Sequence, residues 1–373
     1  MRITDSITSS NAIYNINEGR IKLDRLNERI ASGNNVSRPS DDPVATRKIL
    51  EVETEIKTSN QYISNIKSGT TWLEMAGTSL EGLLSTVMSI RGTAGQALGA
   101  LDDPVKKGEV LDQLRFMRDQ LLDYPNVQVG SQYVFSGFKS NVAPFSATTV
   151  EPNITVGSFA ISNIDTADLY VGLPISGPGI PANSTVASIP TPGAAGSITF
   201  TNSNTPPVAA GATTTTPRTL SYSGTFKGTS DIFNIDVNKT VQLPISVTGD
   251  TILRGGTPPG SEGIDIIKTL DTLIADVDSG NLAGIQAANV SFEQATQEML
   301  GTISAVGMRK SRLENALQSQ QRTYNILSTI RDDLQNVDMS AAAISLTNQK
   351  NAFEAALAAT AKISPLSLLS YLQ

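Results

Sequence analysis

The chain has 373 residues, a net charge of −7 and a pI of about 4.8, and it contains neither cysteine nor histidine. An acidic molecule is not drawn as a whole towards nucleic acid or anionic lipid. The two missing residue types exclude thiolate nucleophiles, disulfides, the usual zinc ligands and the commonest proton-transfer side chain. Aromatic residues make up only 5% of the chain, so we expect a core of small aliphatic residues, as in packed helices. The length suggests two or three domains.

The amino-terminal stretch MRITDSITSSNAIYNI is polar and lacks the continuous apolar run of a secretory signal. No apolar run in the chain reaches the roughly 18 residues that a membrane span needs. The sequence therefore predicts neither a cleaved signal peptide nor membrane insertion.

The first periodic segment steps through Ile16, Leu23, Leu26 and Ile30 at helical spacing, and Gly33 follows as a helix stop. A much longer heptad pattern begins after Pro43 and predicts a continuous helix from Val44 to about Leu98, roughly 80 Å long at about 1.5 Å per residue. Its two seam rows are Ile49, Ile56, Ile63, Thr70, Gly77, Leu84 and Val52, Ser59, Ile66, Leu73, Leu80, Val87.

Two acidic pairs precede prolines, at Asp41, Asp42, Pro43 and at Asp102, Asp103, Pro104. An adjacent carboxylate pair in a loop is a metal site, a catalytic pair or a helix cap. Proline suits the first helical position, and an aspartate before it accepts hydrogen bonds from the first turn. A metal needs more oxygen ligands than such a pair supplies. The repetition favours helix capping by Asp42 with Pro43 and by Asp103 with Pro104.

The middle of the chain changes character at about residue 125, where apolar and polar residues alternate with glycines, as in a hairpin. From Ser140 to Pro217 there is no lysine or arginine and there are only three acidic residues. Short apolar runs at regular spacing there favour a small β-sandwich or barrel over disorder. A further β-like stretch runs from Ser221 to Val247.

Helices return after this β-rich part, and a heptad row starting at Ile285 predicts a second long helix reaching about Val337. The apolar members of this row that we assign to the seam are Phe292, Met299, Val306, Leu313, Leu327 and Leu334. A last amphipathic segment carries Leu357, Ile363, Leu366, Leu368 and Leu369, which are too apolar to remain in water. Both ends of the chain are thus long amphipathic segments, and they most simply pair with one another.

The sequence predicts an α+β protein: an elongated rod of long N- and C-terminal helices in a coiled-coil bundle, with central β-rich domains. The expected domains are an N-terminal assembly helix and loop (1–43), the first part of the helical rod with its hairpin (44–140), a β-rich outer domain (141–260), the second part of the rod (261–338) and a C-terminal assembly helix (339–373).

Several motifs resemble one known family. RPSDDPVA, GSQYVFSGF and ISPLSLLSYL, together with the long segments around them, resemble the hook-associated protein 3 family, flagellin relatives of the hook-filament junction. The resemblance covers about 140 residues at the front and about 110 at the back. Residues 146–217 look like an insertion, since that family usually continues soon after the Ala143 to Phe145 turn with a β segment like the one near Ser221.

The resemblance implies a structural adaptor whose lower surface matches hook-associated protein 1 and whose upper surface matches flagellin, with other copies completing a ring at the junction. The implied location is extracellular, on the bacterial flagellum. The implied route is the flagellar type III apparatus, with an export chaperone on the C-terminal helix. We expect the assembly interface to use Ile16, Leu23, Leu26 and Ile30 against Leu357, Ile363, Leu366, Leu368 and Leu369. We also expect residues 1–35 and 340–373 to order only on assembly.

Three alternatives are weighed against this adaptor. The chain could be a filament subunit of flagellin type, or it could carry residues 146–217 as an adhesin-like binding module on a coiled-coil stalk. An enzyme is disfavoured, because there is no phosphate-binding loop and the S-x-x-K match from Ser64 to Lys67 lies within the long heptad helix. No cofactor or metal is expected.

Overall fold

The structure is a computed structural model that describes residues 2–36, 38–40, 42–154, 160–166, 169–177, 180–201, 220–256 and 259–369. The side chains of residues 2–9, 153–154 and 362–369 are not described. The chain divides into two compact units. Unit 1 consists of Met1–Ile63 and Gln318–Gln373, and unit 2 consists of Ser64–Leu317. Each unit is described by itself.

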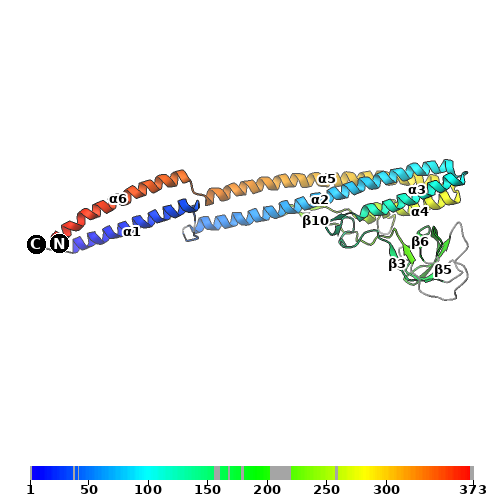
Figure 1. Cartoon of the computed structure of the whole chain (residues 1–373), viewed down its shortest axis with the longest axis horizontal. Coiled ribbons are helices and arrows are strands. Elements are labelled where there is room, and N and C mark those ends of the chain that lie inside the picture. Colours follow the sequence, from blue (N-terminus) through cyan, green and yellow to red (C-terminus); the bar gives the residue numbers. More distant parts are fainter. Residues whose placement is uncertain are drawn as a thin grey trace. The chain divides into compact units, whose positions relative to one another are not determined.

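Long helices make up both ends of the chain (Figure 1). α1 lies wholly in unit 1 with α6, α3 and α4 lie in unit 2, and α2 and α5 contribute to both units. The predicted α+β class, with long terminal helices and a central β-rich part, is confirmed. The helices are α1 (Arg2–Ser32), α2 (Pro43–Ala100), α3 (Pro104–Asp123), α4 (Ile266–Ser279), α5 (Leu282–Gln335) and α6 (Met339–Leu369).

Aspartate caps begin several of these helices. The Asp42 side chain accepts hydrogen bonds from the amides of Val44 and Ala45, at 3.1 and 2.9 Å. Asp103 accepts from Val105 and Lys106, at 3.0 and 3.4 Å. Pro43 and Pro104 are the first residues of α2 and α3. Such a cap contributes about 1 kcal/mol to helix stability. Asp41 lies outside the described residues.

Two further caps have no proline to mark them in the sequence. Asp265 accepts from the Lys268 amide at the start of α4, and Asp338 accepts from the Ser340 and Ala341 amides at the start of α6. α4 itself is a separate helix that ends at Gly280, whose φ of 76° is left-handed. The heptad row that starts at Ile285 gives no sign of α4 as a helix of its own.

The core of unit 2 is a bundle of α2, α3, α4 and α5. The seam residues Leu73 and Leu80 on α2 and Phe292 and Leu313 on α5 have no exposed surface. Burying a leucine or phenylalanine side chain contributes about 1.5 to 3 kcal/mol. A second buried row on α2, absent from the predicted seam, consists of Ala76, Leu83, Ile90 and Ala97. It is buried because α3 and α4 add a third and fourth wall to the pair of long helices.

Two short hairpins pack on this bundle. The strands β1 (Gln128–Val129) and β2 (Gln132–Tyr133) pair across a turn with Gly130 at a φ of 64°. The strands β10 (Asn234–Asp236) and β11 (Gln242–Pro244) form the other hairpin, and their Ile235 and Leu243 side chains join the helical core. The C-terminal part of the predicted β-like stretch from Ser221 to Val247 therefore packs on the helical bundle.

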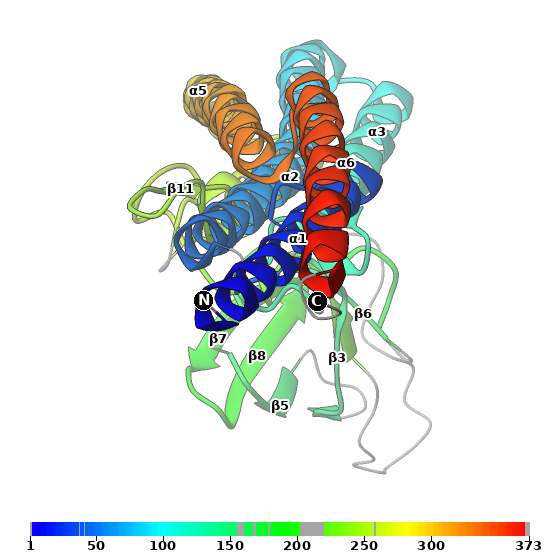
Figure 2. The ribbon, with the colours of Figure 1, turned by 90° about the vertical axis from the view of Figure 1, so that its left-hand side faces the viewer.

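A third β element is an antiparallel sheet of seven strands in the order β3-β9-β6-β7-β8-β5-β4. Its edge strands β3 and β4 are consecutive in the chain and only Glu151 and Pro152 separate them. The sheet must therefore roll until its two edges approach, as in a barrel (Figure 2). The strands are β3 (Thr148–Val150), β4 (Asn153–Ile154), β5 (Ala160–Ile164), β6 (Pro174–Ser176), β7 (Ser184–Thr191), β8 (Gly196–Thr201) and β9 (Leu220–Tyr222).

The rolled sheet has a hydrophobic core of its own, separate from the helical core, with Ile161, Ile198, Phe200 and Leu220 at its centre. The strand that enters it, β3, pairs with the strand that leaves it, β9, in the register Thr149 to Ser221. This element corresponds to the insertion predicted at 146–217, of which residues 155–159, 167–168, 178–179 and 202–217 lie outside the described residues.

Candidate assembly surface

In unit 1, α1 and α6 lie side by side as an antiparallel pair (Figures 1 and 2). The pair is fastened at one end by backbone hydrogen bonds from Asn35 to Gln335 (2.7 Å) and from Val337 to Gly33 (2.9 Å). Further along, a Cβ added to Gly19 would lie only 3.0 Å from the Phe353 ring. Glycine at position 19 thus allows the close approach of the two helices.

The predicted interface residues of α1 lie on the face that carries Gly19. Ile16, Leu23, Leu26 and Ile30 are all half-buried, so α6 covers them only in part. On α6, the side chain of Leu357 is 42% exposed. Ile363, Leu366, Leu368 and Leu369 belong to α6 or its end, but their side chains lie outside the described ones.

Contacts within the chain define a register between α1 and α6 that the heptad spacing had left open. The link between Asn34 and Asn336 and the approach of Phe353 to Gly19 place Leu26 opposite residues near Leu346. The predicted assembly interface set Ile16, Leu23, Leu26 and Ile30 as a group against the group from Leu357 to Leu369, without pairing single residues. Heptad spacing identifies the faces that pair, but it leaves the axial register open, because every shift by seven residues preserves the pattern.

Large apolar side chains remain on the outside of this helix pair. On α1 they are Ile13, Tyr14 and Ile21, with 57%, 65% and 44% of their surface exposed. On α6 they include Ile344, which is 63% exposed. Tyr14 and Ile21 are seven residues apart and therefore share a face of α1. The stripe of Ile16, Leu23, Leu26 and Ile30 alone does not reveal this second face.

The remaining seam residues of unit 1 lie on α2 and α5. Ile49 and Ile56 are buried at 9% and 8% exposure, while Ile63, Leu327 and Leu334 are half-buried. Two polar seam positions meet here: the Ser59 hydroxyl donates to Oε1 of Gln320 at 3.1 Å. In unit 2 the corresponding seam is closed, with Met299 and Val306 at 2% and 4% exposure. On α5, the seam row is thus closed in unit 2 and partly open in unit 1.

A buried polar cluster joins the rolled sheet to the helices within unit 2. Nε of Arg118 on α3 donates to Oδ1 of Asp271 on α4 at 2.5 Å, and the Tyr170 hydroxyl donates to Oδ2 at 2.6 Å. The other guanidinium nitrogens of Arg118 reach the hydroxyl and the carbonyl of Ser223, at 3.0 and 2.8 Å. Tyr170 belongs to the predicted insertion, so the sheet is attached to the bundle at a defined point.

Burial dominates the proton equilibria of this cluster. It raises the pKa of Asp271 above its usual value, and the positive charge of Arg118 works in the opposite direction. Burial, followed by the negative charge of Asp271, raises the pKa of Tyr170 well above its usual value. The Tyr170 hydroxyl therefore stays protonated and donates a hydrogen bond to the Asp271 carboxylate. The arrangement is that of a structural cross-link.

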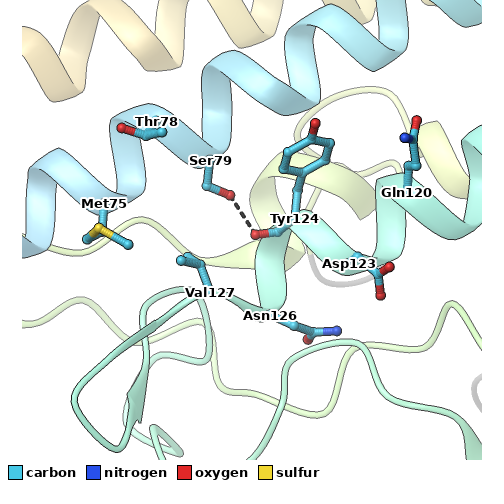
Figure 3. A pocket seen from close by; sticks show the side chains of 8 residues that line it. All are labelled: Met75, Thr78, Ser79, Gln120, Asp123, Tyr124, Asn126 and Val127. Carbon is cyan, nitrogen blue, oxygen red and sulfur yellow. Dashed lines mark hydrogen bonds between the residues drawn. The ribbon is translucent and has the colours of Figure 1, made fainter.

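A groove of about 410 Å³ runs between α2 and the turn after α3 (Figure 3). Its apolar lining is Met75, Val127 and the ring of Tyr124, and its only described charged group is Asp123. The Ser79 hydroxyl on its wall donates to the main-chain oxygen of Tyr124 at 2.6 Å. Among the described lining residues, Asp123 and Tyr124 are the titratable groups.

Neither a metal centre nor a transmembrane helix is found in the part of the chain that the structure describes. No three carboxylates of the described residues gather where they could hold a metal ion. No described helix combines the length and the apolar character that crossing a bilayer requires.

Comparison with known proteins assigns the class of protein. Residues 3–140 match the model of the bacterial flagellin N-terminal helical region, and residues 290–372 match that of the C-terminal helical region. The two matches together cover more than half of the chain and correspond to its two helical ends. The chain belongs to the bacterial flagellin family.

Two curated relatives of the chain have the same name. Flagellar hook-associated protein 3 of Salmonella typhimurium is 27% identical over 155 residues, which are 40% of this chain and 47% of that protein. The protein of the same name from Escherichia coli is 26% identical over 152 residues, 39% of this chain and 46% of that protein. The chain thus spans about half the length of the curated relatives it matches. The predicted relationship to hook-associated protein 3 is confirmed.

A solved structure assigned to a flagellar hook-associated protein of Vibrio parahaemolyticus has a similar fold. It superposes with a TM-score of 0.53 at 19% sequence identity, over 79% of this chain and 100% of that chain. At this identity the comparison shows a shared fold.

Proposed function

We propose that this chain is a structural adaptor subunit of the bacterial flagellum, which joins the hook to the flagellin filament. The observation that carries the proposal is the exposed apolar surface of the α1–α6 pair in a relative of hook-associated protein 3. Tyr14 and Ile344 alone leave about two thirds of their surface to solvent. Large apolar side chains left exposed along one helix pair favour a site of protein association.

The mechanism is association without chemistry. A subunit that adds to the end of a growing assembly needs different surfaces towards the subunit below and the subunit above, which is a heterologous contact. The proposed partner below is hook-associated protein 1, the partner above is flagellin, and copies of this chain lie to each side in a ring. The partly open seam of Ile63, Leu327 and Leu334 would be completed by these neighbours.

Export belongs to the same proposal. The chain would leave the cell through the flagellar type III apparatus without a cleaved signal peptide. A chaperone would cover the apolar surface of residues 339–373 until assembly. The proposal places the mature protein outside the cell, at the hook-filament junction.

The main experiment is to locate the labelled protein on isolated flagella by electron microscopy. A single band between hook and filament is expected for an adaptor. Label along the whole filament would contradict the proposal and would identify a filament subunit instead. Label on the flagellum that persists only while residues 151–219 are present would identify the rolled sheet as a surface-binding module.

Variants separate association from folding. Replacing Tyr14 and Ile21 together by serine removes exposed apolar surface, so we expect an unchanged far-ultraviolet spectrum and loss of filament attachment. Leu26→Ala opens the contact with α6 inside the chain, and we expect the same loss of attachment together with weaker hydrogen-exchange protection of α1. Arg20→Gln, an exposed polar change on α1, is the matched control. Normal motility of the Tyr14 and Ile21 variant would contradict the proposed surface.

A further inference from the structure

A second cavity of unit 2 differs from the groove in Figure 3 in its chemistry. It has a volume of about 320 Å³ and lies between the segment after β9 and the π-helical turn η2 (Asp250–Arg254). π-helical turns occur frequently at functional sites. The lining residues are Phe226, Gly228, Thr229, Ser230, Asp250, Arg254 and Pro259.

Arg254 is the unusual member of this lining. Its side chain is 7% exposed, and its Nε makes no hydrogen bond with any described residue. The nearest carboxylate oxygen, Oδ2 of Asp265, is 4.0 Å away and also lacks a hydrogen-bond partner among the described residues. Leaving a buried guanidinium nitrogen without a hydrogen bond is destabilising. The cavity beside it therefore suits a polar occupant.

The charges around the cavity select the kind of occupant. Arg254 is positive, whereas Asp250 in the lining and Asp265 behind Arg254 are acidic, and Asp250 is only 3% exposed. A small anion would be repelled by the two carboxylates. A metal cation would lie beside the guanidinium and would lack a third acidic ligand, because no group of three such side chains gathers among the described residues. A neutral molecule that both donates and accepts hydrogen bonds meets neither penalty.

The other lining groups suit hydroxyl groups and one apolar face. The Ser230 hydroxyl, which lines the cavity, donates to Oδ2 of Asp250 at 3.1 Å. The Phe226 ring supplies an apolar wall, and a Cβ at Gly228 would lie 2.5 Å from its tip, so glycine lets the main chain pack against that edge of the ring. Donors, acceptors and an aromatic face together fit the alternating CH and OH groups of a sugar ring.

We propose that this cavity binds a neutral sugar or polyol about the size of one monosaccharide. The volume is at the small end of ligand pockets, which usually hold about 300 to 1,000 Å³. Arg254 donates to the ligand, Asp250 accepts from it, and Phe226 packs against its apolar face. The site is distinct from the assembly surface and does not depend on the proposed flagellar role.

The test uses the full chain and saturation-transfer NMR with glucose, galactose, mannose and N-acetylglucosamine, with inorganic phosphate and acetate as ionic probes. We expect at least one of the sugars to bind saturably, with a dissociation constant in the millimolar range, about −4 kcal/mol. Saturable binding of phosphate or acetate at the same site, or no saturable binding of any sugar, would overturn the proposal. The second result would mean that the cavity holds water only.

Two variants place the binding in the cavity. Arg254→Gln removes the buried charge and is expected to weaken sugar binding at least about tenfold, equal to about 1.4 kcal/mol. Ser230 is exposed, so Ser230→Ala should fold even where Arg254→Gln does not. We expect Ser230→Ala to weaken sugar binding several-fold. Thr78→Ala, which removes a hydroxyl from the groove in Figure 3, is the control. Unchanged binding in folded Arg254→Gln and in Ser230→Ala would place the sugar elsewhere and refute the assignment.

Discussion

One heptad row on α5 is fully buried in unit 2 and only half-buried in unit 1. In unit 2, Phe292, Met299, Val306 and Leu313 are between 0% and 4% exposed. In unit 1, the next apolar members of the same row, Leu327 and Leu334, are only half-buried. Side chains of the same kind at the same spacing are thus closed off in one unit and open in the other.

The difference follows from the number of helices that surround each seam. In unit 2, α3 and α4 join the two long helices and close the core, whose members include Leu114, Leu121 and Leu270. No additional helix of unit 1 gives α2 and α5 such a cover in the described part of the chain. A seam that its own chain leaves open can be closed by a neighbouring subunit, which is the behaviour expected of an assembly protein.

The largest expected effect is on the closed seam. Phe292→Ala removes a fully buried ring, so it should lower the free energy of unfolding by about 3 to 5 kcal/mol, measured by urea denaturation. Val290→Ala, two residues earlier and with 59% of the valine exposed, is the control and should change it by less than about 0.5 kcal/mol. Equal effects of the two variants would mean that the core of unit 2 is not closed in solution.

The polar cluster of unit 2 should be nearly as sensitive. Arg118→Met leaves Asp271 buried without its positive partner and should cost about 3 kcal/mol. Arg115→Met, one turn earlier on the more exposed pair with Asp112, should cost less than about 1 kcal/mol. A small effect of Arg118→Met would show that water reaches Asp271.

The same variant has a signature in its pH dependence. Burial already raises the pKa of Asp271, so the folded state binds its proton to higher pH than the unfolded chain does. This group therefore favours folding below the unfolded pKa of about 3.9, and its contribution declines as pH rises through the folded pKa. Without Arg118 the decline should be steeper and extend to higher pH, which unfolding curves across pH 4 to 7 would detect.

In the free chain, truncating a side chain of the half-buried α5 seam in unit 1 should lower stability less than truncating one of the buried seam in unit 2. Leu327→Ala should lower the free energy of unfolding by about 1 kcal/mol, whereas Leu313→Ala, two heptads earlier on the same helix, should cost about 2 to 5 kcal/mol. We expect Leu327→Ala to impair assembly more than its effect on stability suggests. If Leu327→Ala and Leu313→Ala lower the free energy of unfolding equally in a verified monomer, the contrast between the two units is wrong.

The smallest expected effect on stability is at the hydrogen bond between Ser59 and Gln320 in the seam of unit 1. Ser59→Ala removes the hydrogen bond to Gln320 and should cost about 0.5 to 1 kcal/mol. Gln320→Leu combined with Ser59→Ala should recover part of that loss, because two apolar groups then face each other. A double-mutant cycle measures the coupling, and additive single effects would mean that the two side chains do not interact in solution.

Much of the helical architecture could be predicted because its signals are local. The heptad rows predicted a helix from Val44 to about Leu98, close to the bounds Pro43–Ala100 of α2. Paired aspartates before Pro43 and Pro104 indicated two helix starts, since a cap and its amides lie within three residues of each other. The boundaries of α4 were missed, because its apolar pattern reads as a continuation of neighbouring helical segments.

Pairings between distant segments could not be predicted in the same way. The buried row of Ala76, Leu83, Ile90 and Ala97 is explained only by the presence of α3 and α4. The cluster of Arg118, Tyr170 and Asp271 joins residues up to 153 positions apart, and none of the three has a sequence neighbour that marks it. The exposed face of Tyr14 and Ile21 could have been found by tracing a second stripe on the same helix.

The sequence by itself determined the long helices, their starts, the β-rich middle and the flagellin family, because periodicity, caps and family motifs depend on residues close together in the chain. Only the tertiary structure decided the register of α1 against α6, the rolling of the seven-stranded sheet, and which stretch of the common seam is closed. Those features depend on which surfaces meet, and a heptad pattern is compatible with many registers and with more than one set of neighbours.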